Sequence, residues 1–190
     1  MKKAVACVML AAAASLFGLQ SSAQALPQEL RPVVPAATLL GQARMKFWGF
    51  EVYQATLWVA PGFAAAAYPQ SPFALELSYL RDFKGADIAK RSIAEMRRQA
   101  AMTPAQETAW EEQMRALFPD VKAGDRITGV NQPGEGAVFW SNGRMLGAVR
   151  DRAFAEQFFG IWLAAQTSEP QMRLALLAQA KPVAAVGTAP

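Results

Sequence analysis

Histidine is absent from the 190 residues of this chain, and the only cysteine is Cys7. Without histidine, the chain cannot form a Ser-His-Asp triad, a Cys-His pair or a histidine general base. Zinc ligation is excluded for the same reason. Asp120, Asp125 and Asp151 are spread over separate turns and lack the dense oxygen pattern of a calcium loop. We therefore expect neither a metal nor a cofactor.

Charged residues are also sparse, at 18% of the chain, whereas 53% of the residues are hydrophobic. This composition predicts one globular domain with a sizeable core, not a disordered chain. The 19 basic and 15 acidic residues leave a net charge of +4, and removing Lys2 and Lys3 lowers it to +2. So small an excess predicts no nucleic-acid partner, and the basic cluster from Lys84 to Arg98 is interpreted as a solvated helix face.

The first 25 residues have the pattern of an export signal. Lys2 and Lys3 are followed by an apolar run from Ala4 to Leu19 and by the small-x-small sequence Ala23-Gln24-Ala25. The run is short for a membrane span, so we expect cleavage after Ala25 and no transmembrane segment in the mature chain. Cys7 leaves with the signal. The prediction is a cysteine-free protein that is periplasmic or secreted and depends on packing, not disulfides.

After the signal, residues 26–38 contain three prolines and are predicted to form an extended lead-in. Residues 43–47 and 52–60 are rich in strand formers and are separated by Gly49, which favours a hairpin. Residues 73–79 alternate between apolar and small or polar side chains, as a half-buried strand does. The period then changes, and an apolar stripe at Ala89, Ile93, Met96 and Ala100 predicts an amphipathic helix.

Helix and strand signals continue to the C-terminus. Thr103-Pro104-Ala105-Gln106 is a capping box, and the helix after it would bury Trp110, Met114 and Leu117. Residues 125–130, 137–141 and 144–149 are predicted strands, the last two joined by Asn142-Gly143. Asp151 is a candidate cap for a third helix, and Ser168 for a fourth. The order of elements predicts an α+β fold, an antiparallel sheet packed against a layer of helices, over residues 39–181, with a flexible tail at 182–190.

Five segments, in this order, resemble the bacterial exported branch of the chalcone isomerase-like family. They are Gly49 to Trp58, Leu77 to Phe83, Phe118 to Asp125, Phe139 to Gly143 with Gly147, and Asp151 to Leu163. The resemblance covers residues from about Leu40 to about Ala178. It implies the open-faced sandwich of that family.

The resemblance implies different functions in different branches. Plant chalcone isomerases close a chalcone to a flavanone without cofactor or metal, in an apolar cleft that holds a cation. Fatty-acid-binding branches hold an acyl chain with its carboxylate near an arginine and a tyrosine. The resemblance places Arg44 as the candidate cation and Tyr53 as the candidate hydroxyl. The alternative is that Arg44 has no functional role and lies with Lys46 and Trp48 on an exposed strand face, where the long stems cover apolar surface.

The polar groups that orient the ketone in the plant enzymes are largely missing here. Tyr53 stands at the position that matches the strand threonine of those enzymes, and residues 88–96 contain no tyrosine and asparagine pair. We therefore expect a non-catalytic protein that binds a small hydrophobic ligand such as a fatty acid. Two alternatives remain, a cofactor-free isomerase acting on a chalcone-like or other unsaturated ketone, and a structural partner in the cell envelope.

Overall fold

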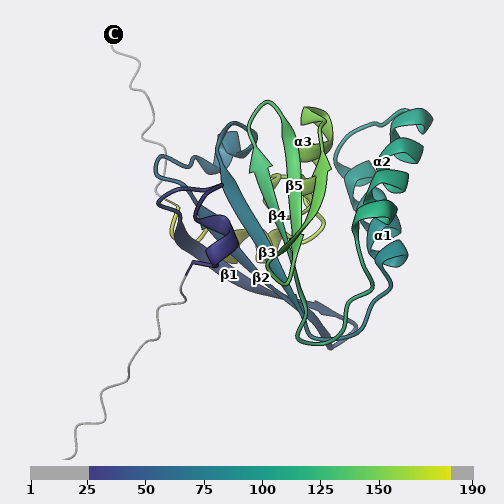
Figure 1. Cartoon of the computed structure of the whole chain (residues 1–190), viewed down its shortest axis with the longest axis horizontal. Coiled ribbons are helices and arrows are strands. Elements are labelled where there is room, and N and C mark those ends of the chain that lie inside the picture. Colours follow the sequence, from purple (N-terminus) through teal and green to yellow (C-terminus); the bar gives the residue numbers. More distant parts are fainter. Residues whose placement is uncertain (1–25, 181–190) are drawn as a thin grey trace, which may run out of the picture.

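The computed structural model describes residues 26–180, which form an open antiparallel sheet of six strands in simple chain order. The strands are β1 (Thr38–Phe47), β2 (Phe50–Val59), β3 (Phe73–Tyr79), β4 (Arg126–Gln132), β5 (Gly136–Ser141) and β6 (Arg144–Val149). Each strand pairs only with its chain neighbours, so the sheet is a meander with β1 and β6 at its edges (Figure 1). The predicted strands and the Asn142-Gly143 turn are confirmed.

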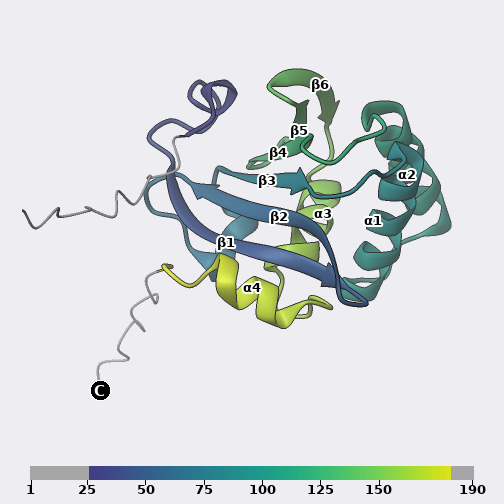
Figure 2. The same cartoon turned by 90° about the horizontal axis from the view of Figure 1, so that it is seen from below.

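Four α-helices cover one face of this sheet. They are α1 (Gly85–Gln99), α2 (Pro104–Leu117), α3 (Arg152–Leu163) and α4 (Pro170–Leu176). In Figure 2, α1 and α2 lie at one end of the molecule, α3 lies behind the sheet and α4 runs along β1. This arrangement confirms the predicted α+β class. Within the described residues, no helix is long and apolar enough to cross a membrane.

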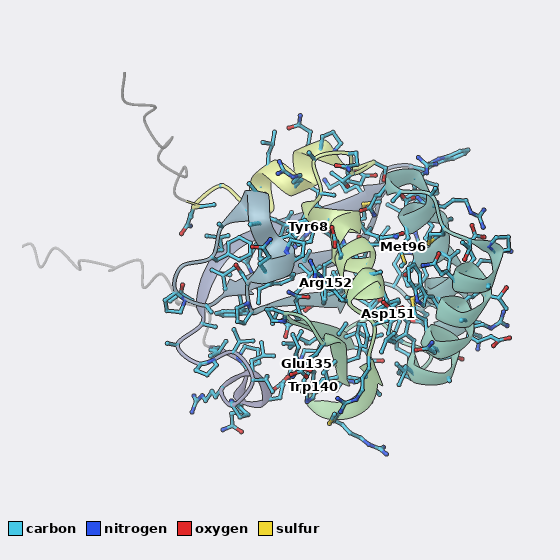
Figure 3. The ribbon with its side chains drawn as sticks, turned by 90° about the horizontal axis from the view of Figure 1, so that it is seen from above. Tyr68, Met96, Glu135, Trp140, Asp151 and Arg152 are labelled. Carbon is cyan, nitrogen blue, oxygen red and sulfur yellow. The ribbon has the colours of Figure 1, made fainter. Side chains whose placement is uncertain are left out.

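Local capping signals decide where the helices begin. The Thr103 side chain accepts a hydrogen bond from the Gln106 amide at 3.2 Å, and the Gln106 side chain accepts from the Thr103 amide at 3.0 Å. Asp151 lies at the start of α3 and accepts from the amides of Ala153 and Phe154 (Figure 3). Its second oxygen accepts from the Trp110 indole at 2.9 Å, which ties α3 to α2.

The predicted cap of the last helix is wrong. Glu169 precedes α4, and no side chain caps that helix. The Ser168 hydroxyl donates instead to the Glu95 carboxylate on α1, at 2.7 Å. A carboxylate acceptor makes a stronger hydrogen bond than a neutral one, so a tertiary partner has replaced the local one.

The second face of the sheet is covered by the segment that the sequence predicts to be merely extended. Residues Gln28–Leu30 form a short 3₁₀ helix, and Leu30 and Val34 are fully buried. They pack against Trp58 of β2 and Trp140 of β5, which is labelled in Figure 3. The strand β3 is therefore buried on both faces, whereas its sequence alternation predicts a half-buried strand. The predicted signal (1–25) and the predicted tail (182–190) lie outside the described residues.

Candidate functional site

A cavity of about 340 Å³ lies between the sheet and helices α1 and α3. That volume is within the range of small-molecule binding sites, near its lower end. Most of the wall is apolar and comes from β1, β3, β4, α1 and α3: Met45, Leu77, Ile127, Ile88, Phe158 and Ile161. The cavity is partly open to solvent, so a ligand has a route into it.

An irregularity in the β1–β2 pairing shapes the floor of the cavity. Met45 pairs with Tyr53, whereas the next residue, Lys46, pairs with Glu51, so Val52 is an additional residue in β2. An extra residue of this kind re-aims the neighbouring side chains of a strand. Both Val52 and Tyr53 line the cavity as a result, although they are adjacent in sequence.

The Tyr53 hydroxyl is oriented by a neighbouring indole. It accepts a hydrogen bond from Trp162 Nε1 of α3 at 3.0 Å. Burial raises the pKa of Tyr53 to about 12, so the phenol stays protonated at neutral pH. Because the oxygen is already an acceptor from Trp162, its own proton remains for another acceptor. Tyr53 therefore offers a hydrogen-bond donor to the cavity.

Tyr79 of β3 supplies a second hydroxyl beside the first. The two residues are cross-strand partners, and their rings meet edge to face with centroids 6.1 Å apart. Burial, and secondarily the neighbouring Tyr53, raise the pKa of Tyr79, so this phenol is also neutral. Tyr79 is buried and lines the cavity, yet its hydroxyl makes no hydrogen bond to any residue in the part of the chain that the structure describes.

Arg91 of α1 is the cation of the cavity wall. Its Nη2 lies 2.6 Å from Glu95 Oε1, an ion pair without the alignment of a hydrogen bond. Arg98 lies 3.8 Å from the other Glu95 oxygen, so two cations surround this one buried carboxylate. The remaining donors of Arg91 contact no acceptor among residues 26–180, and its guanidinium lies 5.9 Å from the centre of the Phe47 ring. Glu95 thus holds Arg91 in place, and other hydrogen-bond donors of the Arg91 guanidinium remain for a ligand.

The two residues that the sequence predicts to bind a ligand together lie on opposite faces of the sheet. Tyr53 faces the cavity, whereas Arg44 and its partner Gln54 point to the other face. Arg44 is bound there to Glu51, with Nη1 2.9 Å from a carboxylate oxygen, and donates to Gln54 at 3.2 Å. The structure does not bring Arg44 to the cavity, because side chains alternate along a strand.

Sequence reasoning missed Arg91 by treating it as part of a solvated helix face. A signal for it exists in the spacing of the cavity-lining residues Ile88, Arg91, Ser92 and Glu95. These positions follow the i, i+3, i+4, i+7 pattern of one helix face. They lie next to the apolar stripe from Ala89 to Met96, so α1 presents two neighbouring faces to the interior. Nothing local distinguishes the second face from a solvated one.

No group of three or more potential metal-ligating side chains is found within residues 26–180. The polar part of the cavity wall includes the carboxylates of Asp87, Glu95 and Glu169 and the hydroxyls of Ser92 and Ser168. Its donors best suited to an oxygen-rich headgroup are the two neutral phenols and the guanidinium of Arg91. These side chains donate hydrogen bonds to an oxygen acceptor such as a carboxylate or a carbonyl.

Comparison with known proteins agrees with this architecture. A solved structure of a fatty-acid binding protein from Arabidopsis thaliana is similar to the chain, with a TM-score of 0.58 and 10% sequence identity. The match covers 75% of this chain and 87% of the plant protein. At that identity the likeness shows the fold. No curated protein sequence matches the chain. The model of the chalcone isomerase-like family matches residues 27–178, which is most of the chain, and the protein belongs to that family.

Proposed function

We propose that this protein is a non-catalytic carrier or sensor of a small, mostly apolar acid such as a fatty acid. The observation that carries the proposal is the composition of the cavity wall, where Arg91 and the phenols of Tyr53 and Tyr79 adjoin an apolar surface. The similarity to a plant fatty-acid binding protein supports the same class of ligand.

The apolar wall would supply most of the affinity. Burying an acyl chain contributes roughly 0.8 kcal/mol per CH₂ before the loss of ligand freedom is subtracted. A cavity of about 340 Å³ favours a short or medium chain that lies along the apolar wall. Affinity should rise with chain length and then level off when the cavity is full.

The headgroup would lie at Arg91 and not at Arg44. A guanidinium offers several donors in one plane, so Arg91 can keep Glu95 and still bind a carboxylate. The two phenols add neutral donors that keep their protons, since burial raises both pKa values. Three carboxylates, Asp87, Glu95 and Glu169, also line the cavity and lower its net charge; Glu95, the one beside Arg91, is offset by Arg91 and Arg98.

The proposal is tested by titrating fatty acids of increasing length into four proteins. Arg91→Ala should weaken binding about 10- to 150-fold, the loss of a charge-assisted hydrogen bond worth about 1.5–3 kcal/mol. Arg44→Ala is the matched control, an arginine of the same domain that is paired with a glutamate on the opposite face. It should bind like the wild type.

The fourth protein, Arg91→Ala/Glu95→Gln, distinguishes two causes of weak binding in Arg91→Ala: the lost contact with Arg91 and the charge of Glu95 that Arg91 no longer offsets. Arg91→Ala leaves Glu95 with Arg98 alone, and its charge would itself repel an anionic ligand. In Arg91→Ala/Glu95→Gln that repulsion is absent, and binding should still be weak. Affinity that ignores chain length, or that falls in Arg44→Ala and not in Arg91→Ala, would refute the proposal.

The donors at the cavity also keep the isomerase alternative open, because they suit the oxygen of a ketone as well as a carboxylate. The chain supplies no histidine, and the described phenols are neutral donors, not bases. Incubation with a hydroxychalcone should therefore give no cyclisation above the spontaneous rate. Turnover that survives stringent purification and disappears in Arg91→Ala would establish the enzyme instead.

We further propose that the protein is exported. The basis is the sequence Lys2-Lys3, the apolar run and Ala23-Gln24-Ala25, all within residues that the structure does not describe. The intact mass of periplasmic material should correspond to a chain that begins at Leu26. Full-length protein in the cytoplasm or the inner membrane would contradict this.

A further inference from the structure

The tip of the β1–β2 hairpin carries an unusual concentration of exposed apolar side chains. Among residues 26–180, six large hydrophobic residues are exposed, and four of them gather here: Phe47, Trp48, Phe50 and Leu80. Trp48 is 88% exposed. Figure 2 shows this tip at the edge of the molecule beside α1, away from the lead-in. The other two, Met145 and Leu174, lie singly on β6 and α4 and need no explanation.

Trp48 also occupies a backbone conformation that a bulky residue rarely adopts. Trp48 and Gly49 have φ values of 51° and 80°. The second tight hairpin of the protein has nearly the same pair of values, 50° and 83°, at Asn142 and Gly143. Asparagine and glycine are the residues that such a turn favours, because both tolerate positive φ. Trp48 therefore stands, at a conformational cost, where asparagine would be the relaxed choice.

Basic side chains surround the aromatic tip. The Arg81 guanidinium lies 4.7 Å from the centre of the Phe50 ring, and Arg91 lies 5.9 Å from that of Phe47. Arg44 and Lys46 project from the same hairpin, and both pair with Glu51. Within residues 26–180, the ion pairs of these four cations involve Glu51 and Glu95, and Arg81 forms no ion pair.

We propose that this hairpin tip inserts into the interfacial region of a lipid bilayer with anionic headgroups. Exposed tryptophan with flanking basic residues is the combination that membrane interfaces favour, with the ring at headgroup depth and the cations against lipid phosphates. A protein partner with an acidic, apolar surface is the other class that such a tip would suit. The bilayer is favoured because Trp48 is 88% exposed at the turn and cations flank the rings, which places an amphipathic ring and positive charges together at headgroup depth.

The tip is continuous with the mouth of the cavity. Phe47 is half exposed and also lines the cavity, together with Val52 and Arg91. A docked hairpin would therefore bring the cavity opening to the lipid surface, where an apolar ligand could enter without crossing bulk water. This last step rests on the proposed ligand-binding function, whereas the docking itself does not.

The test uses the purified protein with vesicles of equal parts phosphatidylglycerol and phosphatidylcholine, measured without added ligand. The other four tryptophans are at most 7% exposed, so a blue shift of fluorescence on vesicle addition reports on Trp48. We expect cosedimentation with these vesicles, a blue shift, and weaker binding in high salt or with phosphatidylcholine alone. Removing one cation, as in Lys46→Gln, should weaken binding about fivefold.

Trp48→Asn is the decisive variant, because it gives both hairpins the same turn sequence. Its melting temperature should equal or exceed that of the wild type, while vesicle binding falls about tenfold or more. Met145→Asn, at another exposed apolar residue, on β6 and away from the tip, is the control and should bind normally. Residues 1–25 are the same in every variant, so they cannot cause a difference. No vesicle binding by the wild type, or undiminished binding by Trp48→Asn, overturns the proposal and leaves the protein-partner class.

Discussion

The two cavity tyrosines should respond differently when each loses its hydroxyl. In Tyr53→Phe, the buried Trp162 Nε1 loses the acceptor that it has at 3.0 Å. An unsatisfied buried donor costs about 1–3 kcal/mol, and water in the cavity should keep the loss near the lower end. Tyr79→Phe removes a hydroxyl with no hydrogen bond to any described residue, so its stability should change by less than about 0.5 kcal/mol.

The losses of fatty-acid affinity in these two variants should not follow the same order as their losses of stability. Both hydroxyls are proposed to donate to the ligand carboxylate, so both variants should bind a fatty acid about tenfold or more weakly. Tyr79→Phe would thus lose affinity while keeping stability. Such a separation is expected of a residue kept for its ligand and not for its packing.

Two measurements check this. Urea denaturation gives the free energy of unfolding, with an unchanged slope showing that the two-state comparison is valid. A fatty-acid titration on the same preparations gives the affinity. If Tyr79→Phe is destabilised as much as Tyr53→Phe, or if both variants bind like the wild type, the assignment of these hydroxyls to the ligand is refuted.

Three further outcomes follow from the packing. Asp151→Ala removes the cap of α3 and the acceptor of Trp110 together, so denaturation should show a loss of about 2–4 kcal/mol, with Asp151→Asn losing less. Gly85→Ala should destabilise by about 1–3 kcal/mol or more in the same assay, because its Cβ would lie 2.0 Å from the Phe118 carbonyl oxygen. Burial raises the pKa of Tyr53 and of Tyr68 to about 12, and that of Tyr79 further, so absorbance should show no phenolate step near pH 10 until the chain unfolds. Since the folded pKa values are the higher ones, the related stability is complete below about pH 10 and falls as pH rises toward 12.

The sequence by itself determined the elements whose signals are local. The Thr103 capping box, the Asp151 cap and the Asn142-Gly143 turn depend on atoms within three residues of one another, and each forms as predicted. The strand β3 and the apolar stripe of α1 were likewise predicted from the geometry of a strand and a helix, although β3 is buried on both faces and not on one. Together with the order of the elements, these signals were enough for the α+β class.

Contacts between residues that are far apart in the chain could not be predicted from the sequence. Ser168 leaves the cap of α4 because Glu95, 73 residues away, is the better acceptor. The lead-in becomes the cover of a second sheet face only because Trp58 and Trp140 lie there.

The binding site was decided in the same way. The family resemblance favoured Arg44 as the cation, and the sequence pattern assigned Arg91 to a solvated helix face. Only the pairing of β1 with β2 and the packing of α1 on the sheet place Arg44 outside the cavity and Arg91 at it. Strand alternation shows which residues of a strand share a face, but not which face is turned to the core. The extra residue Val52 also changes which residues share a face within β2.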